Sequence, residues 1–342
     1  MKPLLITQGD ACGIGPEIAV KAWAAEQGLP GAGPLCLVGD VEVWRRALRI
    51  AGLDLPVARL DHPAEAACAP PRSLPVWQPP GMPPGLLDEP LGRISAKAGA
   101  GAACCIEAAV AAVQAGEGCG IVTAPIHKEA LHAAGVPFPG HTEMLQSLAA
   151  PTGGTPPPVR MMLANEELKT VLVTIHVSLR RALDLVTKAA VLETLRITRD
   201  SLRRFGIEAP RIAVAGLNPH AGEGGLFGDE ELREIAPAVA AARAEGIDAR
   251  GPFAPDTVFM RARHAPPAHP GEFDAVVAMT HDHGLIPVKY LGVEQGVNVT
   301  LGLPFVRTSP DHGTAFDIAG QGIADASSMR AALRMAHQLS QG

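Results

Sequence analysis

The chain has 342 residues, of which 47% are hydrophobic and 19% are charged, and its formal net charge is −6. The mild acidity argues against a nucleic-acid-binding protein, which normally carries a basic stripe. The apolar part of the N-terminal segment is too short for a signal peptide, and no uninterrupted apolar run reaches the roughly 20 residues of a membrane span. The six cysteines show no CxxC pair, which is typical of reduced thiols, so we expect a cytoplasmic location.

Apolar runs of strand length alternate with longer helical patterns along the chain, as in α/β proteins with mostly parallel strands. In chain order, the first half of the pattern predicts a strand over 4–9, a helix from 16, a strand over 36–40, helices over 41–51 and 95–115, and a strand over 119–124. The second half predicts strands over 159–163 and 168–175, a helix over 187–205, a strand over 211–217, a helix over 229–245, a strand over 274–280 and a last helix over 325–338. The turn-forming pair Asn165-Glu166 predicts an antiparallel hairpin between the two strands that flank it.

Two proline-rich stretches interrupt this pattern. Residues 70–85 predict a surface excursion that is neither helix nor central strand, because proline lacks a backbone donor. Residues 151–158 predict a hinge or linker. We therefore expect two α/β lobes, the first formed by 1–126 with 305–342 and the second, which holds the metal and substrate site, by 127–304.

Three histidines each close an apolar run of strand length: His176 ends LKTVLVTIH, His220 follows RIAVAGLNP and His281 follows DAVVAMT. The carboxyl ends of strands in open α/β sheets are where ligands bind. One such histidine alone is better explained as a core or capping residue. Three in the same context favour a shared divalent metal, because three histidine ligands with an open position are typical of catalytic centres.

Two short motifs indicate anion contacts near strand ends. GDACGIGPE (9–17) leads into a helix whose first amides are free to bind an anion, although a plain tight turn explains it equally well. His141 and Thr142, in GHTE, stand at a predicted helix start and suit a phosphate or carboxylate; the alternative is an N-cap threonine with an incidental histidine. Lys128, which ends TAPIHK, is either a cleft residue or a solvated surface charge.

Further polar residues follow in the last third of the chain. Lys289, Asn298 and Arg307 recur at nine-residue intervals and are the donors that a phosphate needs, or else three surface polar residues. Asp256 is a candidate for orienting a metal-bound histidine. In HDHG (281–284), alternation along an extended chain predicts that His281 and His283 point one way and Asp282 the other. The stretch DHGTAFDIAG (311–320) points to a nucleotide.

Together these motifs resemble the 4-hydroxythreonine-4-phosphate dehydrogenase family of pyridoxal phosphate biosynthesis. The resemblance spans nearly the whole chain, through GDACGIGPE, TAPIHK, GHTE, GLNPHAGEGG, HDHGLIPVKY and GVNVTLGLPFVRTSPDHGT. It implies two α/β lobes with a cleft between them, similar to isocitrate and isopropylmalate dehydrogenases and without a Rossmann domain. It also implies a homodimer whose active site is shared across the interface, with His281 supplied by the partner subunit.

Carried over by position, the resemblance places the metal on His176, His220 and His281 and the substrate on His141, Thr142, Lys289, Asn298 and Arg307. NAD is the implied cofactor, on an adenosine-side loop that contains His312, Gly313 and Asp317. The metal is expected to be zinc, with cobalt, magnesium or manganese as alternatives. Two departures from the family pattern stand out: Ala11-Cys12 replace Pro-Ala, and Thr280 and His283 replace Tyr and Gln.

The expected reaction is oxidation of the C3 hydroxyl of 4-phosphooxy-L-threonine by NAD⁺, followed by loss of CO₂. The general base is one of Lys128, Asp256 and His283. The first alternative is a dehydrogenase of 4-phospho-D-threonate or 4-phospho-D-erythronate in sugar-acid catabolism. A non-catalytic phosphate- or metal-binding protein is the alternative of another class.

Overall fold

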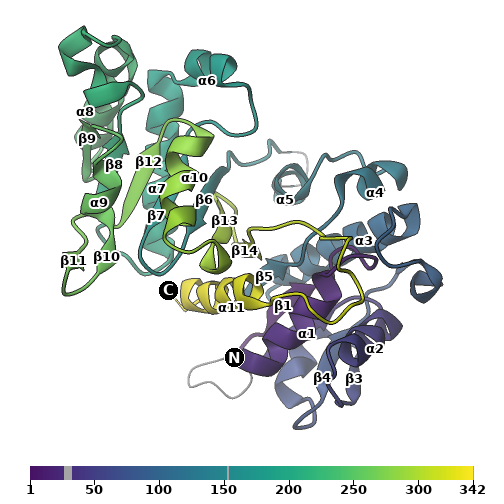
Figure 1. Ribbon diagram of the computed structural model, residues 1–342. Coiled ribbons are helices and arrows are strands. Elements are labelled where there is room, and N and C mark those ends of the chain that lie inside the picture. Colours follow the sequence, from purple (N-terminus) through teal and green to yellow (C-terminus); the bar gives the residue numbers. More distant parts are fainter. Residues whose placement is uncertain (27–32, 152–153, 342) are drawn as a thin grey trace. The chain divides into compact units, whose positions relative to one another are not determined.

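The computed structural model describes residues 1–26, 33–151 and 154–341 (Figure 1). The chain divides into two compact units, the first formed by Met1–Pro157 and Leu303–Ser340 and the second mainly by Pro158–Gly302. Each is a mixed α/β unit with its own set of sheet strands, so the predicted α/β class is confirmed.

The first unit is built on six parallel strands in the order β3-β4-β2-β1-β5-β14. Its strands are β1 (Leu4–Thr7), β2 (Leu35–Val38), β3 (Val57–Leu60), β4 (Leu74–Trp77), β5 (Gly120–Thr123) and β14 (Val306–Pro310). Its helices are α1 (Gly15–Glu26), α2 (Val41–Ile50), α3 (Ala96–Gln114), α4 (Lys128–Ala133), α5 (His141–Leu148) and α11 (Ser327–Leu339), with short 3₁₀ turns η1 (Pro63–Cys68) and η2 (Leu86–Asp88). Because all six strands run the same way, their carboxyl ends share one edge of the sheet.

Local sequence explains where these helices begin. The Asp40 carboxylate accepts the amides of Glu42 and Val43 at 2.8 and 2.9 Å, and the Ser95 hydroxyl accepts the amide of Ala98 at 3.1 Å. Each side chain satisfies an amide that the first turn of a helix leaves unpaired.

Helix α3 is long and apolar enough to cross a membrane by length and composition, yet ten of its 19 residues are buried in the structure. It packs against β1, β5 and α4, and Gly99 faces the backbone of Ala130 so closely that a Cβ would lie 2.1 Å from its carbonyl oxygen. Burial in the first unit therefore accounts for its apolar surface.

The second unit is built on six strands in the order β13-β6-β7-β12-β8-β9. Its strands are β6 (Arg160–Ala164), β7 (Lys169–Leu172), β8 (Ile212–Ala215), β9 (Ala249–Phe253), β12 (Ala275–Ala278) and β13 (Val297–Leu301), with a small ribbon of β10 (His264–Ala265) and β11 (His269–Pro270). Its helices are α6 (Leu179–Leu185), α7 (Lys188–Arg204), α8 (Ala236–Ala244), α9 (Val258–Ala262) and α10 (His281–Tyr290), with shorter turns η3 (Pro219–Gly225), η4 (Glu231–Ile235, a π-helix) and η5 (Val293–Gln295). Strands β7, β12, β8 and β9 are parallel, whereas β6 pairs antiparallel with β7 and with β13.

The predicted hairpin is confirmed, since β6 and β7 are antiparallel neighbours. The Asn165 carboxamide oxygen accepts the amides of Glu167 and Leu168 at 2.9 and 2.8 Å, which makes the tight turn between the two strands. The long predicted helix is also confirmed: α7 begins after Thr187, whose hydroxyl accepts the Ala190 amide at 3.2 Å.

The prediction for 70–85 was wrong in one respect. Within this stretch Leu74–Trp77 form β4, which lies between β3 and β2 and is therefore an interior strand. Proline is tolerated there because the register between β2 and β4 comprises only Leu37–Val76 and Val38–Trp77, beyond Pro75. The burial of Leu74 and Val76 supplies the packing that outweighs the missing amide.

The compact units differ from the predicted lobes over residues 127–157. These residues belong to the first unit, because α4 and α5 both pack against α3. The change of unit falls at Pro157–Pro158, within the proline-rich stretch expected to be a linker; residues 152 and 153 of that stretch lie outside the described residues. At the other end, the second unit closes at Gly302 rather than at residue 304.

Candidate active site

A buried arginine near the start of β14 extends its guanidinium to the carboxyl end of the neighbouring strand β5. Arg307, on β14, is 3% exposed, and its Nε and Nη2 donate to the Thr123 hydroxyl of neighbouring β5 at 3.2 and 2.6 Å. Burial lowers the pKa of its guanidinium to about 10, so it is still charged at neutral pH. A buried, oriented guanidinium is suited to an anion such as a phosphate.

The predicted partners of this arginine in the first unit stand at the start of α5. His141 and Thr142 are the first residues of that helix, after Gly140. The Nε2 atom of His141 is buried and has no hydrogen-bond partner. Burial and, to a lesser extent, the positive charge of Arg307 hold the pKa of His141 well below its usual range. The imidazole is therefore neutral and free to exchange a hydrogen bond with a bound ligand.

Two more polar groups follow the predicted strands β1 and β5 at this edge, although sequence reasoning had not singled them out. Asp10, which follows β1, is fully buried; its Oδ1 accepts the Cys12 amide at 2.8 Å, whereas its Oδ2 has no partner. His127, which precedes α4, has a buried Nδ1 without a partner, and its ring stacks on Phe316 with centroids 4.8 Å apart. Because Phe316 belongs to the predicted nucleotide loop, this stack joins that loop to the end of β5.

The predicted nucleotide loop follows β14 within the first unit. The Thr314 carbonyl accepts the amide of Ile14, and a Cβ on Gly13 would lie 2.9 Å from Thr314. The loop therefore packs on the GDACGIGPE turn. His312, Gly313 and Asp317, the predicted cofactor contacts, are solvent-exposed on this loop.

In the second unit, two of the three predicted metal ligands approach one another. The rings of His176, after β7, and His281, at the start of α10, have centroids 5.7 Å apart and are tilted by 46°. Two imidazoles on one tetrahedral ion place their ring centres about 5 Å apart, because each metal–nitrogen bond is about 2.0–2.1 Å long. The His281 Nδ1 lies 2.7 Å from the Asp282 carboxylate, the kind of contact that orients a metal-binding imidazole. This pair therefore fits a divalent cation.

The third predicted ligand is held apart from this pair. Across the part of the chain that the structure describes, no group of three His, Cys, Asp or Glu side chains is close enough to hold a metal ion. His220 lies instead on η3, where its ring faces Phe227 with centroids 6.1 Å apart.

The backbone that carries His220 is strained. Five consecutive residues, from His220 to Gly224, have positive φ angles of 53°, 52°, 78°, 43° and 67°. A left-handed conformation costs about 1–2 kcal/mol for each residue other than glycine, and His220, Ala221 and Glu223 all adopt it here. His176 has a positive φ of 43° as well. Strain of this kind persists where the surrounding structure enforces it, often at functional sites.

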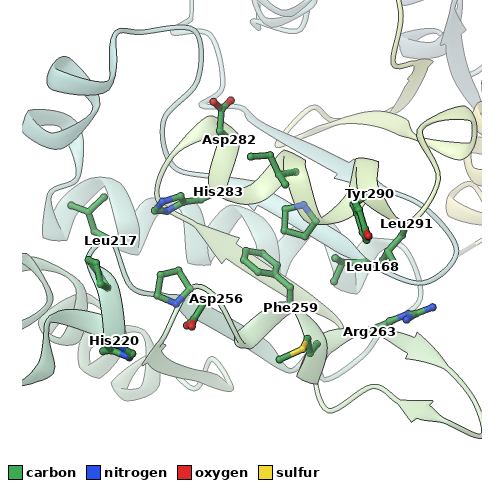
Figure 2. A pocket seen from close by; sticks show the side chains of 15 residues that line it. Leu168, Leu217, His220, Asp256, Phe259, Arg263, Asp282, His283, Tyr290 and Leu291 are labelled. Atoms are coloured by element: carbon green, nitrogen blue, oxygen red, sulfur yellow. The ribbon is translucent and has the colours of Figure 1, made fainter.

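The expected alternation of HDHG is wrong, because His281 begins the helix α10 and the chain is not extended there. Successive helical side chains point about 100° apart, so His281, Asp282 and His283 face three directions. His283 turns to a cavity of about 660 Å³ within the second unit, which His220 and Asp256 also line (Figure 2). Most of the other lining residues are apolar, among them Leu217, Phe259 and Ile286.

Comparison with known proteins places the chain. Residues 32–336 match the sequence profile described as "Pyridoxal phosphate biosynthetic protein PdxA". The chain belongs to the PdxA family. It is 51% identical to the 4-hydroxythreonine-4-phosphate dehydrogenase of Beijerinckia indica, over 98% of this chain and 95% of that protein. It is 45% identical to the D-threonate 4-phosphate dehydrogenase of Salmonella typhimurium, over 99% of both.

Solved structures show the same likeness. The crystal structure of 4-hydroxythreonine-4-phosphate dehydrogenase from Klebsiella pneumoniae superposes with a TM-score of 0.88 at 45% identity and covers 100% of this chain and 98% of that one. A terephthalate 1,2-cis-dihydrodiol dehydrogenase from Burkholderia xenovorans is more distant, with a TM-score of 0.67 at 29% identity over 98% of each chain. The resemblance to the family is therefore confirmed, and these relatives are dehydrogenases.

The remaining predicted residues of this PdxA-family chain lie on separate elements. Lys289 is in the last turn of α10 and Asn298 is on β13, both in the second unit, whereas Arg307 belongs to the first. Of the candidate general bases, Lys128 and Asp256 are exposed and His283 is partly buried. Burial lowers the pKa of His283, and the Asp282 carboxylate opposes that shift.

Sequence reasoning missed four polar residues: Asp10, Thr123, His127 and Glu231. Thr123, His127 and Asp10 stand at or directly after strands that had been predicted, so position alone could have marked them. Glu231 lies in the acidic run 229–231, which reads as an ordinary helix start. In fact its side chain is only 2% exposed and accepts three hydrogen bonds.

Proposed function

We propose that this protein oxidises 4-phosphooxy-L-threonine at its C3 hydroxyl with NAD⁺ and releases CO₂, NADH and 3-amino-2-oxopropyl phosphate, a step of pyridoxal phosphate biosynthesis. The observation that carries the proposal is the buried Arg307 guanidinium beside the neutral His141, a setting suited to a phosphate monoester. The names of full-length relatives at 48–51% identity, all 4-hydroxythreonine-4-phosphate dehydrogenases, support it.

In this proposal the chain's own residues hold and orient the substrate. Arg307, fixed by Thr123, binds the phosphate, and His141 and Thr142 add neutral hydrogen bonds at the α5 start. Lys289 and Asn298 are the proposed substrate contacts that the second unit supplies. NAD⁺ would supply the hydride acceptor for C3, and a divalent cation held by His176, His220 and His281 would supply a Lewis acid for the oxygen on that carbon.

We further propose which chain supplies each cation ligand. His176 and His281 come from one chain, since their rings are 5.7 Å apart. His220 is then the ligand that a second copy supplies in a homodimer with a shared site. This reverses the role expected for His281. Zinc is the proposed ion, and His312, Gly313 and Asp317 are the proposed NAD contacts on the loop that packs against Gly13.

The candidates for the general base are Lys128, Asp256 and His283. Each is replaced singly by Met, Asn and Gln respectively, and the pH dependence of kcat is measured. The variant of the true base loses turnover and also loses the acidic limb of the profile.

A second candidate substrate is 4-phospho-D-threonate. It is favoured by the 45% identity to the Salmonella dehydrogenase over 99% of both chains. His283 in place of the family's Gln, next to the cation ligands, is the departure that bears on this choice.

The test is NADH formation by the purified protein with 4-phosphooxy-L-threonine and, separately, with 4-phospho-D-threonate, each with and without a chelator. Turnover of the first, lost on chelation and restored by Zn²⁺, supports the proposal. Turnover of the second alone moves the protein to sugar-acid catabolism. A rate that chelation leaves unchanged contradicts the cation role.

A further inference from the structure

The segment that carries His220 is a left-handed turn, which an L-amino-acid chain does not hold by itself. From His220 to Gly224 every φ is positive, and three of the five residues have side chains that disfavour this region. Three backbone hydrogen bonds close the turn: from the Ala221 amide to the Asn218 carbonyl at 3.1 Å, from the Phe227 amide to the Gly222 carbonyl at 3.1 Å, and from the Leu226 amide to the Glu223 carbonyl at 3.4 Å. A group outside the turn must therefore hold the backbone at the residues where the turn begins.

That role falls to the carboxylate of Glu231, at the start of the π-helix η4. Its Oε1 accepts the amides of Leu217 and Asn218 at 2.7 and 2.8 Å, and its Oε2 accepts the Asn218 side-chain amide at 2.9 Å. All three donors precede His220 by two or three residues. The carboxylate therefore anchors the backbone at the point where the chain leaves β8 and enters the turn.

Three surrounding glycines leave the space that this carboxylate and its amide partner occupy. A Cβ on Gly222 would lie 2.8 Å from Glu231 Oε2, and a Cβ on Gly216 would lie 3.0 Å from Oε1. A Cβ on Gly228 would lie 2.5 Å from the Asn218 side-chain nitrogen. The three glycines thus leave room for the buried carboxylate and its amide partner on three sides.

The ionised form is the one that this setting favours. Burial of Glu231 raises its pKa, but the hydrogen bonds from Asn218 and Leu217 outweigh that cost and hold the pKa below its ordinary value. Among the described residues, this buried carboxylate accepts three hydrogen bonds and has no arginine or lysine bonded to it. Such an arrangement is unusual for a turn at the surface.

We infer that Glu231 is a positioning residue, whose carboxylate locks the left-handed turn and thereby sets the place and direction of the His220 imidazole toward the divalent cation. This inference rests on the proposed function, in which His220 is a cation ligand. Partners that orient a metal ligand typically alter metal affinity or activity by 10- to 100-fold when they are replaced.

The experiment compares Glu231→Gln with Asp229→Asn in the full-length protein. Gln fills the same space, but its amide nitrogen must face either the backbone amides or the Asn218 nitrogen, both of which are donors. Asp229 is the matched control, an exposed carboxylate two residues away that pairs with Arg233 at the surface. Co²⁺ serves as the probe ion, because its visible absorption reports its ligands. Glu231→Ala, which removes the carboxylate altogether, is added if Glu231→Gln changes the turn too little to test the inference.

Three quantities are measured for each variant: Co²⁺ affinity, hydrogen exchange of residues 217–228, and kcat with the substrate that the wild type turns over. For Glu231→Gln we expect Co²⁺ affinity and kcat to fall about 10- to 100-fold and exchange to rise within 217–228 only. Asp229→Asn should match the wild type. Faster exchange in 217–228 with unchanged Co²⁺ affinity and kcat would overturn the inference, since Glu231 would then only stabilise the turn.

His220→Ala separates the inference from the proposal beneath it. If this variant loses Co²⁺ binding while Glu231→Gln keeps it, the positioning role fails and the proposed function stands. If His220→Ala binds Co²⁺ as tightly as the wild type, the proposed cation role of His220 fails, and the inference fails with it.

Discussion

Arg307 donates two hydrogen bonds to the hydroxyl of Thr123, one strand away in the first unit. This contact fixes the plane of the guanidinium before any ligand arrives, because the threonine side chain on β5 is itself buried. A pre-oriented charge loses little entropy when it binds an anion.

Arg307→Lys should therefore weaken binding of the phosphorylated substrate more than it lowers the stability of the fold. Lysine keeps the charge but not the two-pronged geometry, and the loss of one charge-assisted hydrogen bond is worth about 1.5–3 kcal/mol, or roughly 10- to 100-fold in KM. Steady-state kinetics measure KM for substrate and for NAD⁺ separately. Arg334→Lys, on the exposed side of α11, is the control and should change neither. An unchanged substrate KM in Arg307→Lys would remove the phosphate role.

Asp10 should make the protein less stable as pH rises. Burial raises the pKa of its carboxyl from 3.8 to about 6, so the folded state binds a proton that the unfolded chain has already released in this window. Unfolding free energy then falls as pH rises through the window, by up to about 3 kcal/mol. Asp10→Asn should have a higher Tm than the wild type near pH 8 and a similar Tm near pH 5. Equal Tm differences at both pH values would contradict this assignment.

His141 should make the protein less stable as pH falls, which is the opposite of the trend expected for Asp10. Because burial and Arg307 lower the pKa of its imidazole in the folded protein, the unfolded chain binds a proton first as pH falls below about 6.5. The stabilisation is thus present above that pH and is lost as pH decreases. The drop in Tm between about pH 7.5 and 5.5 should be smaller for His141→Gln than for the wild type. His132→Gln, an exposed histidine on α4, should retain the full drop.

The cation ligands can be assigned to chains by mixing inactive variants. If His176 and His281 serve one site from the same chain, mixed dimers of His176→Ala and His281→Ala subunits contain no intact site. Mixed dimers of His176→Ala and His220→Ala contain one intact site, since each chain supplies what the other lacks. We expect activity to recover only in the second mixture. Recovery in the first mixture would return His281 to the partner subunit.

Gly99 sets the approach of α4, which carries Lys128, to α3. Gly99→Ala forces its Cβ to within 2.1 Å of the Ala130 carbonyl oxygen, which is backbone and cannot rotate away. We expect a loss of about 1–3 kcal/mol, despite the roughly 1 kcal/mol that alanine gains over glycine in a helix. Gly101→Ala, in the same helix, has as its nearest neighbours the methyl groups of Leu86 at 3.0 and 3.4 Å, which can move, and should cost far less. Urea unfolding of both variants measures the difference.

The positions of the histidines at strand ends could be predicted, but not which of them meet. His176 and His281 each follow a buried run, β7 and β12, and these strands are parallel neighbours, so their ends come together. His220 follows β8, which is also a neighbour of β12, yet the left-handed turn carries it elsewhere. Four glycines between 222 and 228 are visible in the sequence, whereas the left-handed conformation of His220, Ala221 and Glu223 and the burial of Glu231 are not.

The sequence by itself determined the α/β class, the hairpin at Asn165, the approximate limits of α2, α3, α7 and α11, and the family, because these depend on local periodicity, capping side chains and ordered motifs. Tertiary structure alone decided that Leu74–Trp77 is an interior strand, that residues 127–157 join the first unit, and that HDHG opens a helix. It also decided the surroundings of Asp10, His127 and Glu231: the burial of Asp10, the stack of His127 on Phe316, and the hydrogen bonds from Leu217 and Asn218 to Glu231. Burial and hydrogen bonding between segments far apart in sequence leave no periodic trace in the residues themselves, which is why these features could not be predicted from them.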